Sequence, residues 1–203
     1  IKVMTGIRRS GKSVMLELIK EELAEAGVAP SQMISINFED MRYSHLQTAT
    51  ALHDEIIKRA EGIEGKAYLF FDEIQEVEGW EKCVNSLRVA LDCDIYITGS
   101  NAKLLSGELA TYIGGRYVEF VIYPFSFAEF LELYHTIAPS DSIQQCFQKY
   151  LLAGGMPYLA NLRYEEEPSR QYLTDLFNSV QLKDIVKRNK IRDIDCLLYT
   201  SPS

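Results

Sequence analysis

The segment Gly6-Ile7-Arg8-Arg9-Ser10-Gly11-Lys12-Ser13 gives the strongest structural signal in the chain, because it matches the pattern G-x-x-x-x-G-K-[ST]. Four residues between two glycines let the backbone curl, so that several N–H groups face inward and hold phosphate oxygens. A glycine at each end permits conformations and close approaches that a Cβ atom would block. We therefore predict a phosphate-binding loop over residues 6–13.

The residues on either side of this loop fit that prediction. Residues 1–5 form a short apolar run typical of a strand. From Lys12 to about Ala26 the apolar residues have helical spacing, and Gly27 stands where a C-terminal cap belongs. A helix that begins at the loop adds its N-terminal dipole to an anion site. We expect Lys12 to reach the β- and γ-phosphates of a nucleotide and the Ser13 hydroxyl to bind Mg²⁺.

Nucleotide contacts are predicted along the whole loop and the start of the helix, from Gly6, Ile7, Arg8, Arg9, Ser10, Gly11, Lys12, Ser13 and Val14. Arg8 and Arg9 leave two alternatives open. Either they reach the nucleotide, a neighbouring subunit or a nucleic acid, or they are solvated on the outer face of the loop. A glycine turn without any ligand is the structural alternative for the whole segment.

Two acids, Asp72 and Glu73, directly follow the apolar run of residues 67–71. Such a run predicts a strand that is buried on both faces. An acid at the carboxyl end of a parallel strand beside a phosphate loop can hold Mg²⁺ through water, which is the role predicted for Asp72. Glu73 can polarise the attacking water as a general base, and this favours an ATPase over a kinase. The structural alternative is that both acids cap the following turn.

The first two thirds of the chain alternate strand-like and helix-like segments, which predicts a parallel sheet with helices on both faces. Further strands are predicted over residues 33–38, 95–98 and 117–123, and further helices over residues 53–60 and 80–91. After Pro124 only helical patterns follow. We therefore expect a nucleotide-binding core at 1–124, a helical lid at 125–195 and a non-native tail at 196–203. Six aromatic residues are expected in the core, with a platform for base stacking as the alternative: Tyr117, Phe120, Tyr123, Phe125, Phe127 and Phe130.

Composition narrows the function further. With 21 Lys and Arg against 29 Asp and Glu, the net charge of −8 argues against a protein that coats nucleic acid, although a local basic patch is compatible with it. The four cysteines form no CxxC pair, so neither a zinc site nor a disulfide framework is expected. The same cysteine usage predicts a cytoplasmic location. No apolar run approaches the roughly 18–20 residues that span a bilayer, so no membrane partner is expected. Because the chain starts without Met on an apolar run, we expect a fragment.

Three more segments extend the pattern: Ile97-Thr98-Gly99-Ser100-Asn101-Ala102, Gly114-Gly115-Arg116 and Pro124-Phe125-Ser126-Phe127-Ala128-Glu129-Phe130. Together with the loop and the Asp-Glu pair, they resemble the AAA+ superfamily over about residues 1–195. The resemblance is to the bacterial and archaeal ATP-binding proteins with a G-x-R-R-x-G-K-[ST] loop. It implies an α/β fold, namely the three-layer αβα sandwich of P-loop NTPases. The implied parallel sheet has five strands in the order 5-1-4-3-2 and is followed by a small all-α lid.

The resemblance also implies roles for individual residues. Asn101 corresponds to the sensor that touches the γ-phosphate or the attacking water, with a helix N-cap as the alternative. Arg116 stands where an arginine finger lies, usually supplied to a neighbouring subunit, with a structural salt bridge as the alternative. Asn37 matches a polar residue that can hold the catalytic Glu73 inactive. Gly155-Met156-Pro157 fits a segment that lies against adenine, or it is a plain helix break.

The expected function is Mg²⁺-dependent ATP binding and hydrolysis that drives a conformational change in an attached or partner module. The expected partners are ATP and either a second copy of the chain or another protein that supplies or receives Arg116. Two alternatives stay open. One is a nucleotide-gated switch or adaptor with slow turnover that recruits a partner or DNA. The other is a small P-loop kinase.

Overall fold

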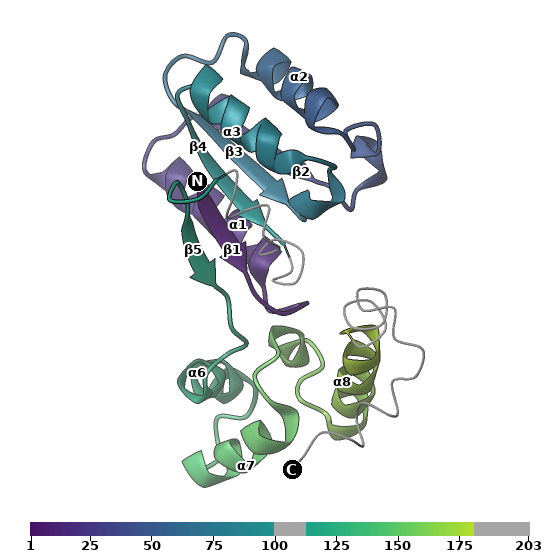
Figure 1. Cartoon of the computed structure of the whole chain (residues 1–203). Helices are drawn as coiled ribbons and strands as arrows, with labels where there is room; N and C mark the ends of the chain where they lie inside the picture. Colours follow the sequence, from purple (N-terminus) through teal and green to yellow (C-terminus); the bar gives the residue numbers. More distant parts are fainter. Residues whose placement is uncertain (100–112, 181–203) are drawn as a thin grey trace, which may run out of the picture. The chain divides into compact units, whose positions relative to one another are not determined.

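The computed structural model describes residues 1–99 and 113–180 (Figure 1). Backbone contacts divide the chain into two compact units, of which the first ends at Tyr123 and the second begins at Pro124. The expected non-native tail at 196–203 lies outside the described residues. Each unit is built around a hydrophobic core of its own.

The first unit contains a five-stranded sheet in the order β2-β3-β4-β1-β5, in which all neighbouring strands are parallel. Its strands are β1 (Lys2–Thr5), β2 (Met33–Asn37), β3 (Ala67–Asp72), β4 (Cys93–Thr98) and β5 (Val118–Val121). This is the implied order 5-1-4-3-2 read from the other edge. The predicted fold class and sheet are therefore confirmed.

Helices cover both faces of this sheet (Figure 1). One face packs against α1 (Lys12–Glu25), and the other packs against α2 (Ala49–Ala60) and α3 (Trp80–Ala90). Alternation along β3 shows why its sequence is apolar throughout: Phe70 packs on the α1 face, whereas Leu69 and Phe71 belong to the core under α2 and α3. The described part of this unit also contains three short 3₁₀ turns: η1 (Pro30–Gln32), η2 (Met41–Tyr43) and η3 (Ile74–Glu76).

The edge strand β5 departs from the expectation. All four of its residues are exposed, and Phe120 and Tyr123 are 49% and 74% exposed. The expectation that these two aromatics are core residues is therefore wrong. The reason is position, because β5 has a neighbouring strand, β1, on one side only.

Strand register brings the carboxyl ends of the inner strands together. Asn37 of β2 is paired with Asp72 of β3, and Phe71 is paired with Ile97, so Asp72 lies beside Thr98 at the end of β4. β1 ends at Thr5 on the same edge, because Met4 is paired with Thr98. Segments that leave this edge are thus held close together by the sheet itself.

The second unit is helical, with α6 (Phe127–Ile137), α7 (Ile143–Ala153), η4 (Pro157–Ala160) and α8 (Glu166–Val180). α6 and α7 each begin with a capping box, formed by a serine and the residue three positions later. Aromatic rings make up much of its core, which includes Phe130, Tyr134, Tyr164 and Tyr172. No helix in the described ranges combines the length and the apolar character that crossing a membrane requires.

Candidate functional site

The glycine-rich loop leaves the sheet after β1 and ends where α1 begins at Lys12. Gly6 has a φ of 150°, and a Cβ atom there would lie 2.3 Å from the carbonyl oxygen of Ile122 and 2.9 Å from Ser10 Oγ. Gly11 precedes α1 in the left-handed conformation, with a φ of 102°. Both positions therefore require glycine. Gly6 has no room for a Cβ atom and has a positive φ, whereas Gly11 requires glycine because of its positive φ alone.

Two polar groups are buried inside this loop. Lys12 is only 5% exposed, and its ammonium donates to the carbonyl oxygens of Gly6 (3.3 Å) and Ile7 (3.0 Å). The Ser10 hydroxyl is also buried, and within the described part of the chain it has no hydrogen-bond partner. Buried polar groups are normally paired, so an unpaired hydroxyl beside an ammonium points to a ligand rich in acceptors. The loop thus fits a phosphate group.

The remaining loop residues lie nearer the surface. Ile7 and Arg9 are exposed and Arg8 is half-buried, while Ser13 and Val14 are exposed on the first turn of α1. Arg9 has a φ of 62°, so the backbone turns sharply between the two glycines. Whether these side chains contact a nucleotide stays a prediction.

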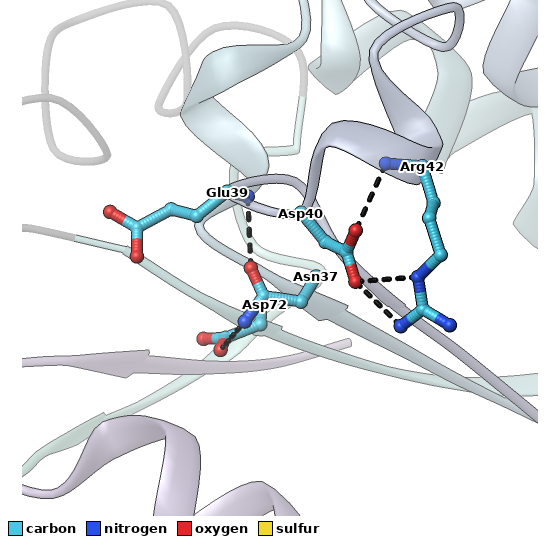
Figure 2. Close-up of polar contacts among 5 residues, drawn as sticks. All are labelled: Asn37, Glu39, Asp40, Arg42 and Asp72. Carbon is cyan, nitrogen blue, oxygen red and sulfur yellow. Dashed lines mark hydrogen bonds and ion pairs between the residues drawn. The ribbon is translucent and has the colours of Figure 1, made fainter.

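Asp72 is 7% exposed, and each of its carboxylate oxygens accepts a hydrogen bond. Asn37 Nδ2 donates to Oδ2 over 3.1 Å, and the Thr98 hydroxyl donates to Oδ1. The other end of the Asn37 amide accepts from the backbone N–H of Glu39 over 2.9 Å (Figure 2). Two neighbouring strands therefore hold the Asp72 carboxylate in place.

Figure 2 also shows how the chain continues after β2. The Asp40 carboxylate accepts from the backbone N–H of Arg42 and from its guanidinium, which fixes the first turn of η2. The hydrogen bond from the Arg42 side chain, assisted by the one from its backbone, holds the pKa of Asp40 below its usual range. This local pair closes the turn that follows β2.

Glu73 follows β3 in the left-handed conformation, with a φ of 54°. Its backbone N–H donates to the hydroxyl of Thr98 over 3.1 Å, and its carboxylate accepts from the Gln75 side-chain amide. One buried hydroxyl thus joins Asp72 and Glu73, because Thr98 Oγ1 donates to the first and accepts from the second. The sequence pattern assigns no role to Thr98 or Gln75, although a threonine that closes an apolar strand is a usable signal for a polar group at this edge of the sheet.

The structure changes the interpretation of Asn37. It was expected to hold Glu73, but it donates to Asp72. Sheet register explains the difference, since Asn37 is paired with Asp72, whereas Glu73 lies beyond the last residue of β3. Asn37 therefore fixes the carboxylate that was assigned to the metal, and Gln75 contacts the one assigned to catalysis.

The other predicted site residues are Asn101, Arg116 and Pro157. Asn101 is outside the described residues. Arg116 is exposed in the turn before β5, where its guanidinium donates to Asn85 Oδ1 of α3 over 3.2 Å. Pro157 is the first residue of η4 in the second unit, and its contact with adenine stays a prediction.

A metal at this site would have few protein ligands. The described residues contain no group of three or more His, Cys, Asp or Glu side chains that could hold a metal ion. Mg²⁺ suits such a site, because it is usually bound through one or two protein oxygens, several waters and the phosphates of its substrate. The donor set Asp72 and Ser13 is compatible with that chemistry.

A family described as "AAA domain" matches residues 1–131, which include the loop, the strand end at Asp72 and the turn at Arg116. The chain belongs to the AAA domain family. The match covers the whole first unit and the beginning of the second. AAA-type membership supports a nucleotide-binding function of the P-loop ATPase kind.

Two curated relatives extend over nearly the whole chain. An uncharacterized protein of Haemophilus influenzae is 41% identical over 198 residues, covering 97% of this chain and 49% of its own length. An uncharacterized protein of Methanocaldococcus jannaschii is 34% identical, covering 96% of this chain and 44% of its own length. The chain thus spans about half the length of these relatives.

The solved structures include a similar one, titled as the ORC1 protein of Aeropyrum pernix in complex with DNA. It is 13% identical, covers 89% of this chain and 59% of its own chain, and has a TM-score of 0.45. At this level of similarity it carries no argument about function.

Proposed function

We propose that this chain is an ATPase module that binds ATP with Mg²⁺ and hydrolyses it, driving a conformational change in an attached or partner module. The observation that carries the proposal is the interior of the loop. There, the buried Lys12 ammonium and the unpaired Ser10 hydroxyl are presented by a backbone that only glycine permits. Membership of the AAA domain family supports the same conclusion.

In this proposal the loop binds the phosphate chain of ATP. Lys12 exchanges the carbonyl oxygens of Gly6 and Ile7 for oxygens of the β- and γ-phosphates, and Ser10 gains an acceptor. This exchange is favourable because a phosphate carries full negative charge, whereas a carbonyl is only a dipole. The N-terminus of α1, which begins at the same lysine, adds its dipole.

The chemistry is assigned to the carboxylates at the end of β3. Asp72 and the Ser13 hydroxyl would hold Mg²⁺, which neutralises charge on the phosphates when it is bound. Glu73 would accept the proton of the attacking water, since it is the half-buried carboxylate next to Asp72. The Thr98 hydroxyl links the Asp72 carboxylate to the backbone N–H of Glu73.

Arg116 has a different place in the proposal. Its side chain is exposed and contacts α3, so we assign its charge to the site of a second copy of the chain or of another protein. Pro157 and Asn101 keep the roles that the resemblance implies, against adenine and against the γ-phosphate. Nucleic acid has no support from the net charge of −8.

The test measures ATP affinity and phosphate release for two test variants and two control variants of the chain. Lys12→Ala should abolish ATP binding, while Lys20→Ala on the same helix should leave it unchanged. Glu73→Gln should keep the affinity and lose turnover, while Glu78→Gln at an exposed position should keep both. Hydrolysis by Lys12→Ala at the parental rate would refute the proposal. Tight binding by the parent chain, with a chemical step slower than minutes, would instead favour the nucleotide-gated switch.

A further inference from the structure

Gln75 lies on a short turn that the core fixes firmly. It is the middle residue of η3. The first residue of this turn, Ile74, is fully buried, and Val77, the residue directly after the turn, is buried as well. Backbone hydrogen bonds from Glu76 to Glu73 and from Val77 to Ile74 close the turn. The side chain of Gln75 is therefore presented from a platform that has little freedom to move.

The side-chain amide of Gln75 binds Glu73 but leaves its own oxygen unpaired within the described part of the chain. Its Nε2 donates to Glu73 Oε2, whereas its Oε1 is buried and has no hydrogen-bond partner among the described residues. An unpaired buried acceptor costs about 1–3 kcal/mol, and a glutamine with a purely structural role would normally satisfy both ends. This arrangement favours the contact with Glu73 over complete pairing of the amide.

Each of the two side-chain amides at this edge of the sheet donates to a different acid. Of the two acids, Asn37 donates to Asp72 and Gln75 donates to Glu73. A glutamate side chain has three rotatable bonds, and fixing it costs up to about 2 kcal/mol of conformational entropy. If the glutamate is already fixed before the water molecule binds, this entropy loss does not add to the activation free energy of the reaction.

We propose that Gln75 is the positioning residue for Glu73. It holds Oε2, so that the other oxygen, Oε1, is presented to the water that attacks the γ-phosphate. This inference rests on the proposed function, in which Glu73 is the general base. Gln75 itself touches neither ATP nor the water, and it acts through the orientation of Glu73 alone.

Kinetics of three variants test this role. Gln75→Met keeps the length of the side chain and removes the donor, and it should lower kcat about 10-fold to 100-fold, the size expected for a base displaced by about 1 Å. Its KM and Kd for ATP should stay within about twofold of the parent, because no phosphate contact is lost. Gln75→Glu should lower kcat further, since like charges then face each other. Gln148→Met, the same change at an exposed position of α7, should alter nothing.

A double variant separates positioning from general support of the fold. In the Glu73→Gln background, adding Gln75→Met should leave the residual single-turnover rate unchanged, because the residue through which Gln75 acts is gone. An equal fold-loss in both backgrounds would overturn the inference. So would a rise in KM, or a kcat for Gln75→Met at or above the parental value. Thermal melting followed by circular dichroism checks that each variant folds.

Two further outcomes keep the inference and the proposed function apart. Should Gln75→Met fail to fold, Gln75→Asn replaces it, because it keeps the amide but withdraws it by one methylene and should also lower kcat. If Glu73→Gln alone retains parental turnover, the role of Glu73 fails and the inference fails with it. If Glu73→Gln loses turnover while Gln75→Met keeps it, only the inference about Gln75 fails.

Discussion

The end of β3 and the turn before β5 both carry residues assigned to ATP turnover, yet they are built in opposite ways. At the end of β3, Asp72 is buried, and Thr98 links its carboxylate to the backbone of Glu73. In the turn before β5, Arg116 is exposed, and its guanidinium donates to Asn85. The first region is organised in advance, and the second is not.

This contrast indicates which groups act within their own chain. Preorganised groups stabilise developing charge without reorganising at the moment of reaction, and this requires neighbours that hold them in place. A long exposed arginine gains such neighbours only where a second surface covers it. We therefore expect changes at the loop and the strand ends to act within one chain, and changes at Arg116 to act between chains.

The largest expected effect is that of Gly6→Ala. The new Cβ would meet the Ile122 carbonyl at 2.3 Å, and backbone atoms cannot yield as a flexible side chain can. We expect loss of ATP binding and a clear fall in the thermal midpoint. Gly62→Ala is the matched control, because Gly62 also has a positive φ, of 88°, but no atom lies within 4 Å of its added Cβ.

The control should cost only the backbone strain, about 1–3 kcal/mol of unfolding free energy, and should keep parental ATP affinity. Calorimetry and titration with a fluorescent ATP analogue measure the two quantities. Parental affinity in Gly6→Ala would show that the loop does not need the close approach to Ile122.

Much of this architecture could be predicted from the sequence because each element has its own local pattern. The apolar run of β3, the amphipathic α1 and the glycine spacing of residues 6–11 predict the sheet, the helix and the loop independently. The partners of Glu73 could not be predicted in the same way. They depend on the left-handed conformation of Glu73 after β3 and on the turn that brings the Gln75 amide to its carboxylate.

Exposure of β5 escaped prediction for a related reason. Its apolar and aromatic residues have the pattern of a buried strand, and only the strand order shows that it lies at an edge. The location of Arg116 next to this edge follows from the same order. Sequence pattern thus predicted which segments form strands, while neighbours in the sheet determine which residues are covered.

Complementation between two inactive variants tests the contrast most directly. Arg116→Ala keeps an intact site but cannot supply an arginine, while Glu73→Gln supplies the arginine but lacks the base. Each alone should lose turnover, Arg116→Ala by about 10³-fold, at the low end for such arginines. Mixing the two at high concentration should restore part of the activity, since mixed assemblies contain complete sites.

The activity of the mixture should rise with total protein concentration and vanish on dilution. Phosphate release measured across a dilution series records this. If Arg116→Ala has parental turnover at every concentration, the arginine acts at no ATP site, either in this chain or in its neighbour. Its role would then be structural, through the hydrogen bond to Asn85. Arg59→Ala on α2 is the control, because its side chain pairs with Glu55 within the same helix.

The smallest expected effect is at Thr98, whose hydroxyl donates to the Asp72 carboxylate and accepts from the backbone N–H of Glu73. Thr98→Val keeps the shape of the side chain but leaves Asp72 Oδ1 without a donor and the Glu73 N–H without an acceptor. We expect a loss of about 1–3 kcal/mol in the free energy of unfolding. Because Asp72 then keeps only the Asn37 donor among the described residues, kcat should fall about tenfold and half-maximal activity should need more Mg²⁺.

Thr98→Ser separates the hydroxyl from the packing. It keeps both hydrogen bonds and loses only a buried methyl group, so it should cost about 1 kcal/mol of stability and keep near-parental kcat. Urea unfolding and a Mg²⁺ titration of phosphate release measure the two effects. Asn85→Ala likewise removes the hydrogen bond that Arg116 donates to Asn85, yet it should change kcat less than about twofold, because Arg116 is not fixed for use within its own chain. Equal losses at Thr98 and Asn85 would show that both regions are organised alike.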